Sequence, residues 1–236
     1  MRRILVIKLA SLGDVVQAFG PFAAIRAHHP EAEITLLTTP PYATLLRGAP
    51  WFDRIWSEGR PGWASLPGLW RLARRLRGAG FARVYDLQTS ARSSRYRLLV
   101  GGGAEWSGIA RGATHPHANP QRDAMHTVER QREQLAIAGI TRFPVPDLTF
   151  LDGDVTGFGL PQSFALLVPG ASPGRPGKRW PVERYATLAA GLDLPVAVAG
   201  GAAEAGLARA IQAAAPGAVD LTGRTDFGQL GAVARH

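Results

Sequence analysis

The sequence predicts an α/β protein with two doubly wound domains, residues 1–160 and 161–236. Short apolar segments rich in β-branched residues alternate with stretches of helical periodicity, which is the pattern of parallel strands joined by crossover helices. Residues 144–161 interrupt this pattern with Pro, Gly and Asp, as a linker does, and a second series follows. The length of 236 residues and the hydrophobic content of 46% are sufficient for two cores.

The first strand is predicted at residues 4–7, a continuous apolar run typical of a strand buried on both faces. Apolar residues then recur at helical spacing over 15–25, where Gly20-Pro21 ends a helix or begins a second one. The rest of the first domain is predicted as strands at 34–38, 54–56, 83–87 and 105–109 and helices at 42–47, 66–77, 92–100 and 125–138. The second domain is predicted as strands at 164–168, 195–199 and 218–221 and helices at 182–192, 204–214 and from 226 onward.

The charge is strongly positive, with 27 Lys and Arg against 18 Asp and Glu and a net charge of +9. Lys8 and Lys178 are the only lysines, so arginine carries nearly all of this charge. The excess favours a polyanionic partner such as a phosphate, an anionic lipid surface or nucleic acid. Because an arginine-rich genomic composition explains the same count, the charge alone does not choose among these partners.

Cysteine and apolar patterning exclude several classes of protein. Without cysteine the chain forms no disulfide, has no thiol nucleophile and offers no thiolate to a metal. The apolar stretch near the N-terminus ends too early for a secretory signal, and no run approaches the ~20 residues of a membrane helix. We therefore expect a cytoplasmic protein that contacts a membrane without crossing it.

The turn after the first strand, Ser11-Leu12-Gly13-Asp14, is the first candidate site. Ligands of open parallel sheets bind at the carboxyl ends of the strands, where the Asp14 carboxylate is suited to act as a general base. Aspartate at this place also caps helices, and the sequence leaves both interpretations open. The turn lacks G-x-G-x-x-G and the second strand ends in Thr38-Thr39, which disfavours a nicotinamide dehydrogenase.

A basic, glycine-rich loop at 169–181 is the second candidate site. It places the hydroxyl of Ser172 and the cations of Arg175, Lys178 and Arg179 just before a predicted helix, where the helix N-terminus favours an anion. A diphosphate site and a solvated basic loop both explain this composition. Further along, Gly200-Gly201 precedes Glu204, whose carboxylate is suited either to ribose hydroxyls or to capping a helix.

Four segments of the chain, taken together, resemble the ADP-heptose:lipopolysaccharide heptosyltransferases of glycosyltransferase family 9. They are residues 4–8 running into 11–15, 86–88 with 92–93, 169–171 before 178–181, and 200–201 before Glu204. The resemblance implies the GT-B fold, in which two Rossmann-like domains face a cleft. Members of the family continue past the position of residue 236 into a segment that completes the diphosphate site, so the second domain is expected to be incomplete.

The resemblance also implies an inverting sugar transfer from ADP-heptose that needs neither a metal nor a bound cofactor. Asp14 would be the catalytic base. Donor contacts are implied for Ser172, Lys178 and Glu204, and acceptor contacts for Ser11, Gly13, Asp86, Gln88 and Arg92. The implied acceptor is a phosphorylated, lipid-linked oligosaccharide of the lipopolysaccharide inner core, at the inner face of the inner membrane. Two alternatives remain open: a related transferase that uses another nucleotide sugar, and a non-catalytic nucleotide-binding remnant.

Two further features have competing interpretations. The predicted helix at 66–77 is basic and amphipathic, which suits either an anionic membrane surface or ordinary packing on the sheet. His115 and His117 suggest zinc, but Pro116 between them and the lack of cysteine argue against it, so residues 111–122 are predicted to form a mobile loop facing the acceptor. Tryptophans 51, 56 and 63 do not alternate with basic residues as base-stacking platforms do, and we expect no nucleic-acid partner.

Overall fold

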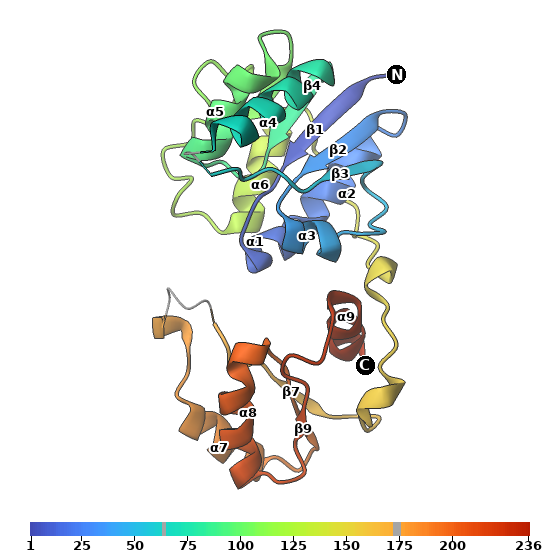
Figure 1. The fold of residues 1–236 in the computed structure, drawn as a ribbon, viewed down its shortest axis with the longest axis vertical. Coiled ribbons are helices and arrows are strands. Elements are labelled where there is room, and N and C mark those ends of the chain that lie inside the picture. Colours follow the sequence, from blue (N-terminus) through green and yellow to red (C-terminus); the bar gives the residue numbers. More distant parts are fainter. Residues whose placement is uncertain (63–64, 172–175) are drawn as a thin grey trace. The chain divides into compact units, whose positions relative to one another are not determined.

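A computed structural model describes residues 1–62, 65–171 and 176–236 of the chain (Figure 1). The chain divides into two compact units, Met1–Phe150 and Leu151–His236, and each contains its own parallel sheet. The prediction of an α/β protein with two sheets is therefore confirmed. No helix in the part of the chain that the structure describes is long and apolar enough to cross a membrane.

The first unit is built on six parallel strands in the order β3-β2-β1-β4-β5-β6. The chain proceeds from β1 outward to β3 and then returns to place β4 against the free side of β1, so the strand order reverses between these two strands. Ile7 at the end of β1 pairs with both Leu37 of β2 and Asp86 of β4. The strands are β1 Arg3–Ile7, β2 Glu33–Leu37, β3 Arg54–Trp56, β4 Arg83–Asp86, β5 Glu105–Gly108 and β6 His115–Pro116.

Helices cover both faces of this sheet (Figure 1). They are α1 Leu12–Val16, α2 Phe19–His28, α3 Pro40–Leu45, α4 Leu66–Gly78, α5 Ala91–Val100 and α6 Thr127–Ile137. On one face, Leu5 and Ile7 of β1 form a buried cluster with Leu72 and Leu76 of α4 and Tyr96 of α5. Alternate strand residues point to opposite faces, so the intervening side chains of β1 pack on the other face, where α6 lies. Burial of both faces explains why β1 is apolar throughout.

The predicted elements of the first unit are all present, with bounds that coincide with the predicted ones or differ from them by up to three residues. Gly20-Pro21 lies in the first turn of α2, where a proline needs no backbone N–H partner, so this pair begins a second helix rather than breaking the first. The prediction of a loop over 111–122 is wrong at its centre. Residues 115 and 116 form β6, which pairs with β5, and the His117 side chain is buried. A two-residue edge strand that contains proline is too short to show the alternating pattern from which a strand is predicted.

The second unit has three parallel strands in the order β7-β8-β9, which repeats the order of β1, β2 and β3. The strands are β7 Ala165–Leu167, β8 Val196–Val198 and β9 Val219–Asp220, and the α-helices are α7 Val182–Gly191, α8 Ala205–Ala214 and α9 Phe227–Arg235. Short 3-10 helices lie at η1 Thr149–Leu151, η2 Thr156–Phe158, η3 Pro176–Lys178 and η4 Ala202–Glu204. Val198 packs with α8 on one face, and Ala197 packs with Val233 of α9 on the other.

The boundary between the units lies after Phe150, earlier than the predicted boundary after residue 160. Residues 151–154 belong to the second unit because α9 holds them. Arg235 donates to the Leu151 carbonyl at 3.0 Å and to Asp152 at 2.9 Å, and Gln229 donates to the Asp154 carbonyl at 3.1 Å. Gly153 in this segment therefore allows close packing against α9 and is not part of a flexible linker.

We predict that Gly153→Ala destabilises the second unit selectively. A Cβ at this position would lie 2.6 Å from the carbonyl carbon of Gly228 and still closer to the Gln229 nitrogen, so backbone must move. Overpacking of this kind costs about 1–3 kcal/mol. Hydrogen exchange should show faster exchange in β8 and α9 with unchanged protection in β1 and β4. Gly157→Ala, where nothing lies within 4 Å, is the matched control; equal effects of the two variants would contradict the packing account.

Candidate functional site

Polar residues gather where the strand order of the first sheet reverses. Lys8 follows β1 directly and Asp86 ends β4, and these two strands are hydrogen-bonded neighbours. The Lys8 side chain, 4% exposed, donates to the Leu87 carbonyl at 3.2 Å, and Asp86 is fully buried. Reversal points of this kind form the crevices in which open α/β sheets bind ligands.

Burial moves the pKa values of this pair toward neutrality. Loss of water raises the pKa of Asp86 to about 7, although the backbone N–H groups of Thr89 and Gln88 donate to Oδ1 at 3.0 and 3.2 Å and stabilise the carboxylate. The same loss of water lowers the pKa of Lys8 to about 8 against the attraction of Asp14. The Ser93 hydroxyl and the charge of Lys8 also favour the Asp86 carboxylate, but together these interactions do not outweigh the effect of burial.

Asp14 lies on α1, close enough to the buried Lys8 to raise its pKa, and it caps the helix. Its Oδ2 accepts hydrogen bonds from the Ser11 backbone N–H at 3.1 Å and from the Ser11 hydroxyl at 2.8 Å. Partial burial opposes ionisation, but these bonds and the positive charges of Lys8 and Arg130 outweigh it and lower the pKa of Asp14. Only one carboxylate oxygen takes part in the cap. Capping and the role of a base are therefore compatible, since the residue is ionised at neutral pH and Oδ1 accepts none of the cap's hydrogen bonds.

The loop after β4 holds the turn that carries Asp14 in place. The Gln88 amide oxygen accepts from the Leu9 and Ala10 backbone N–H groups at 2.7 and 3.0 Å. Ser11 and Gly13 are exposed on the turn itself. The buried Asp86 and the engaged Gln88 thus support the turn, and their contact with an acceptor stays a prediction.

Arg92 and Arg130 extend the site in two directions. Arg92 at the start of α5 donates to the Pro61 carbonyl at 2.7 Å, so it also holds the loop that follows β3. Arg130 of α6 acts electrostatically on both Lys8 and Asp14, and it is not among the residues predicted from the sequence. Gln134, one turn later on the same face of α6, donates to the Asp86 carbonyl at 3.0 Å, so this face of the helix borders the site.

In the second unit, the loops after β7 and β8 meet at Glu204. Its carboxylate accepts from the Gly201 N–H at 2.9 Å and pairs with Arg179 at 3.9 Å. Arg179 also donates to the Ala171 carbonyl at 2.8 Å, which ties the basic loop to the sheet. A Cβ on Gly170 would lie 2.8 Å from Glu204 Cγ, so only glycine leaves room for this carboxylate. Glu204 therefore caps η4, which is one of the two roles that the sequence left open, and it joins the two loops.

The remaining predicted donor residues are Lys178 and Ser172. Lys178 is exposed at the end of η3. Ser172 and Arg175 lie outside the described residues. Within the ranges that the structure describes, no three histidines or acidic residues are grouped as metal ligands.

Two units with parallel α/β sheets are the architecture of the GT-B glycosyltransferases, and solved structures of this class match nearly the whole chain. A glycosyltransferase family 9 protein from Veillonella parvula is 20% identical, with a TM-score of 0.78 over 99% of this chain and 74% of its own. The E. coli ADP-heptose lipopolysaccharide heptosyltransferase II is 23% identical, with a TM-score of 0.73 over 99% and 76%. E. coli heptosyltransferase WaaC with ADP-2-deoxy-2-fluoro heptose is 20% identical, with a TM-score of 0.67 over 99% and 79%.

The family is shown by the sequence itself. Residues 69–236 match the model of glycosyltransferase family 9 (heptosyltransferase), so the chain belongs to this family and is a glycosyltransferase with the GT-B fold. A comparison with curated protein sequences gives no match. The predictions of family, fold class and transferase activity are confirmed.

We predict that Asp86 makes the protein less stable as the pH rises. Its pKa is about 7 in the folded protein and 3.8 ordinarily, so its stabilising contribution is complete below pH 4 and is lost as the pH passes 7. The difference between the two pKa values corresponds to a change in the free energy of unfolding on the order of 4 kcal/mol. Chemical denaturation should show wild type losing stability relative to Asp86→Asn between pH 4 and 7. For the control Asp193→Asn, at an exposed position, stability should depend on pH as it does in wild type. The same pH dependence in Asp86→Asn and wild type would contradict the raised pKa of Asp86.

Proposed function

We propose that this protein transfers heptose from ADP-heptose, with inversion and without a metal, to a sugar of the lipopolysaccharide inner core. The observation that carries the proposal is the ionised Asp14 on an exposed turn at the reversal point of the first sheet. The donor is suggested by the family description and by the relatives' names, an ADP-heptose lipopolysaccharide heptosyltransferase and an enzyme bound to an ADP-heptose analogue.

In the proposed reaction, Asp14 accepts the proton of an acceptor hydroxyl while that oxygen attacks the anomeric carbon of the donor. The bond between the sugar and ADP breaks, and the diphosphate leaves with the electron pair. A positioned general base contributes typically about 10²–10⁴-fold to the rate. The lowered pKa of Asp14 keeps this base available at neutral pH.

The second unit would bind the donor. The cation of Lys178, with the hydroxyl of Ser172, would offset the charge that develops on the departing diphosphate, and such preorganised groups are often the largest catalytic contribution. Glu204 would accept hydrogen bonds from the ribose hydroxyls. Ser11, Gly13 and Arg92 would contact the acceptor, with Asp86 and Gln88 holding the turn in place. The acceptor is lipid-linked and phosphorylated, so the protein would work peripherally at the inner face of the inner membrane, with no cofactor and no nucleic-acid partner.

We predict that Asp14→Asn lowers kcat for ADP release by about 10²-fold or more, the range for loss of a general base. KM for the donor should change little. The amide oxygen still accepts from Ser11, so the cap and the fold should persist. The matched control is Asp154→Asn, because Asp154 makes the same kind of bonds to the N–H and hydroxyl of Thr156. Normal turnover of Asp14→Asn would contradict the base assignment.

We predict that Glu204→Gln weakens ADP binding by roughly tenfold, because a charged hydrogen bond contributes about 1.5–3 kcal/mol and the amide keeps only part of it. The control is Glu183→Gln, an exposed acidic residue of α7. Calorimetric titration with ADP and with UDP measures both affinity and choice of nucleotide. Equal affinity of the two glutamine variants would contradict the donor role, and tighter binding of UDP would favour a transferase for another nucleotide sugar.

A further inference from the structure

Helix α4 presents an exposed apolar and aromatic stripe that packing does not explain. Leu72 and Leu76 bury the inner face of the helix. Leu66 is 74% exposed and Trp70 is 62% exposed, and residues four apart lie on one side of a helix. Arg74 continues the same stripe with its guanidinium 5.5 Å from the centre of the Trp70 ring. The helix contains four arginines and no acidic residue.

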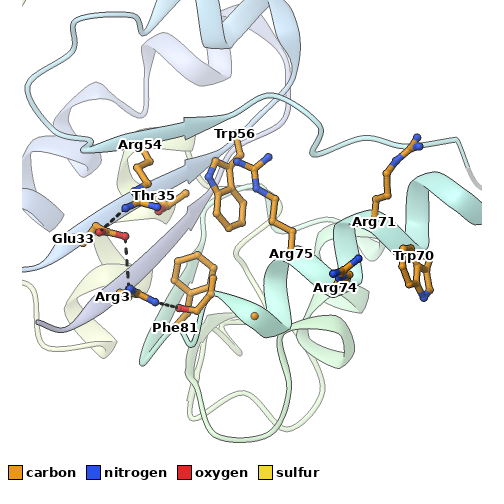
Figure 2. A pocket seen from close by; sticks show the side chains of 12 residues that line it. Arg3, Glu33, Thr35, Arg54, Trp56, Trp70, Arg71, Arg74, Arg75 and Phe81 are labelled. Atoms are coloured by element: carbon orange, nitrogen blue, oxygen red, sulfur yellow. Dashed lines mark hydrogen bonds and ion pairs between the residues drawn. The ribbon is translucent and has the colours of Figure 1, made fainter.

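Beside this stripe lies a hollow of about 430 Å³, and five of the twelve residues that line it are arginines (Figure 2). Arg3 and Arg54 reach it from the amino ends of β1 and β3, and three arginines reach it from α4. Its charged lining residues are Arg3, Glu33, Arg54, Arg71, Arg74 and Arg75. The hollow borders the amino ends of these strands, whereas Asp14 follows the carboxyl end of β1, so it is separate from the candidate catalytic site.

The positive charge of the hollow is only partly neutralised. Glu33 pairs with both Arg54 at 3.2 Å and Arg3 at 3.8 Å, so one carboxylate serves two guanidinium groups. Arg75 pairs with Glu58 and lies 3.9 Å over the Trp56 ring. Arg71 and Arg74 have no acidic partner among the residues that the structure describes. These two cations, next to Trp70 and Leu66, are therefore free to meet an external anion.

We propose that this face of α4 docks on the surface of a bilayer that contains anionic phospholipid. Trp70 and Leu66 enter the headgroup layer, Arg71 and Arg74 contact lipid phosphates, and the hollow receives a headgroup phosphate. Tryptophan is suited to this level because its ring is apolar and its N–H is polar, and each cation near the surface adds to the attraction. A nucleic acid would satisfy the arginines but would offer no apolar layer to Leu66. The proposed function includes a peripheral contact with the membrane, and the α4 face is the surface that we assign to this contact; in this the inference rests on the proposed function.

The test is co-sedimentation of the full chain with phosphatidylcholine vesicles, with and without phosphatidylglycerol. Wild type should bind the anionic vesicles, and quenching by brominated acyl chains should report insertion that Trp70→Ser removes. The double variant Arg71→Glu with Arg74→Glu should bind at least about tenfold more weakly, since it reverses the charge of two cations that would contact the anionic surface. The matched control reverses two exposed arginines of the second unit, Arg184→Glu with Arg209→Glu, and should bind as wild type does.

Each outcome decides the proposal. It is overturned if the α4 double variant binds as its control does, if neutral vesicles bind equally well, or if duplex DNA displaces the protein from vesicles and depends on the same arginines. Circular dichroism establishes that the variants fold. ADP release with a delipidated, water-soluble acceptor separates the two proposals: the α4 double variant should keep wild-type turnover there. Absence of turnover in every protein, with vesicle binding still lost in the double variant, would reject heptosyl transfer and leave the docking surface standing.

Discussion

The pairing of β1 with β4 at the reversal of strand order is the constraint on which the first unit depends. It places Lys8 and Asp86 side by side at the carboxyl edge, because Ile7 and Asp86 are register partners. Both side chains are buried, and the cost of burying a charge shifts the pKa values of both groups toward their neutral forms. The backbone N–H groups that bind Asp86, and the carbonyl that accepts from Lys8, anchor the pair to the sheet.

From this buried pair, hydrogen bonds lead outward to the surface turn. Gln88, two residues after Asp86, fixes the backbone of Leu9 and Ala10, and the next residue, Ser11, donates twice to Asp14. Gln88 lies two residues after the end of β4 and Leu9 two residues after the end of β1, so the position of Asp14 follows from the register of these two central strands. In its proposed role as a base, a carboxylate held in this way needs no reorganisation when the substrate arrives, which is the requirement for efficient general-base catalysis.

The sequence was informative where structure is local and periodic. The run 4–7, the helix at 66–77 and the cap at Asp14 each follow from spacing within a few residues, and the structure contains them all. What it did not reveal depends on distant partners: the pairing of β6 with β5, the hold of α9 on residues 151–154, and the charge of Arg130 on Lys8. The stripe on α4 is an intermediate case. Its periodicity was visible, but the exposure of Trp70 was not, because exposure depends on what the rest of the sheet covers.

Two carboxylates near one lysine have opposite pKa shifts, and the difference follows from depth. Asp86 is fully buried, so desolvation dominates and its pKa rises, whereas the hydrogen bonds and cations around the partly exposed Asp14 outweigh desolvation and its pKa falls. Both carboxylates attract Lys8, and Asp14 is the stronger of the two attractions that raise the lysine pKa. The proposed base at the surface is thus also the main counterion of the buried lysine. Neutralising Asp14 must therefore lower the pKa of Lys8 further, which couples the surface turn to the protonation of the sheet beneath it.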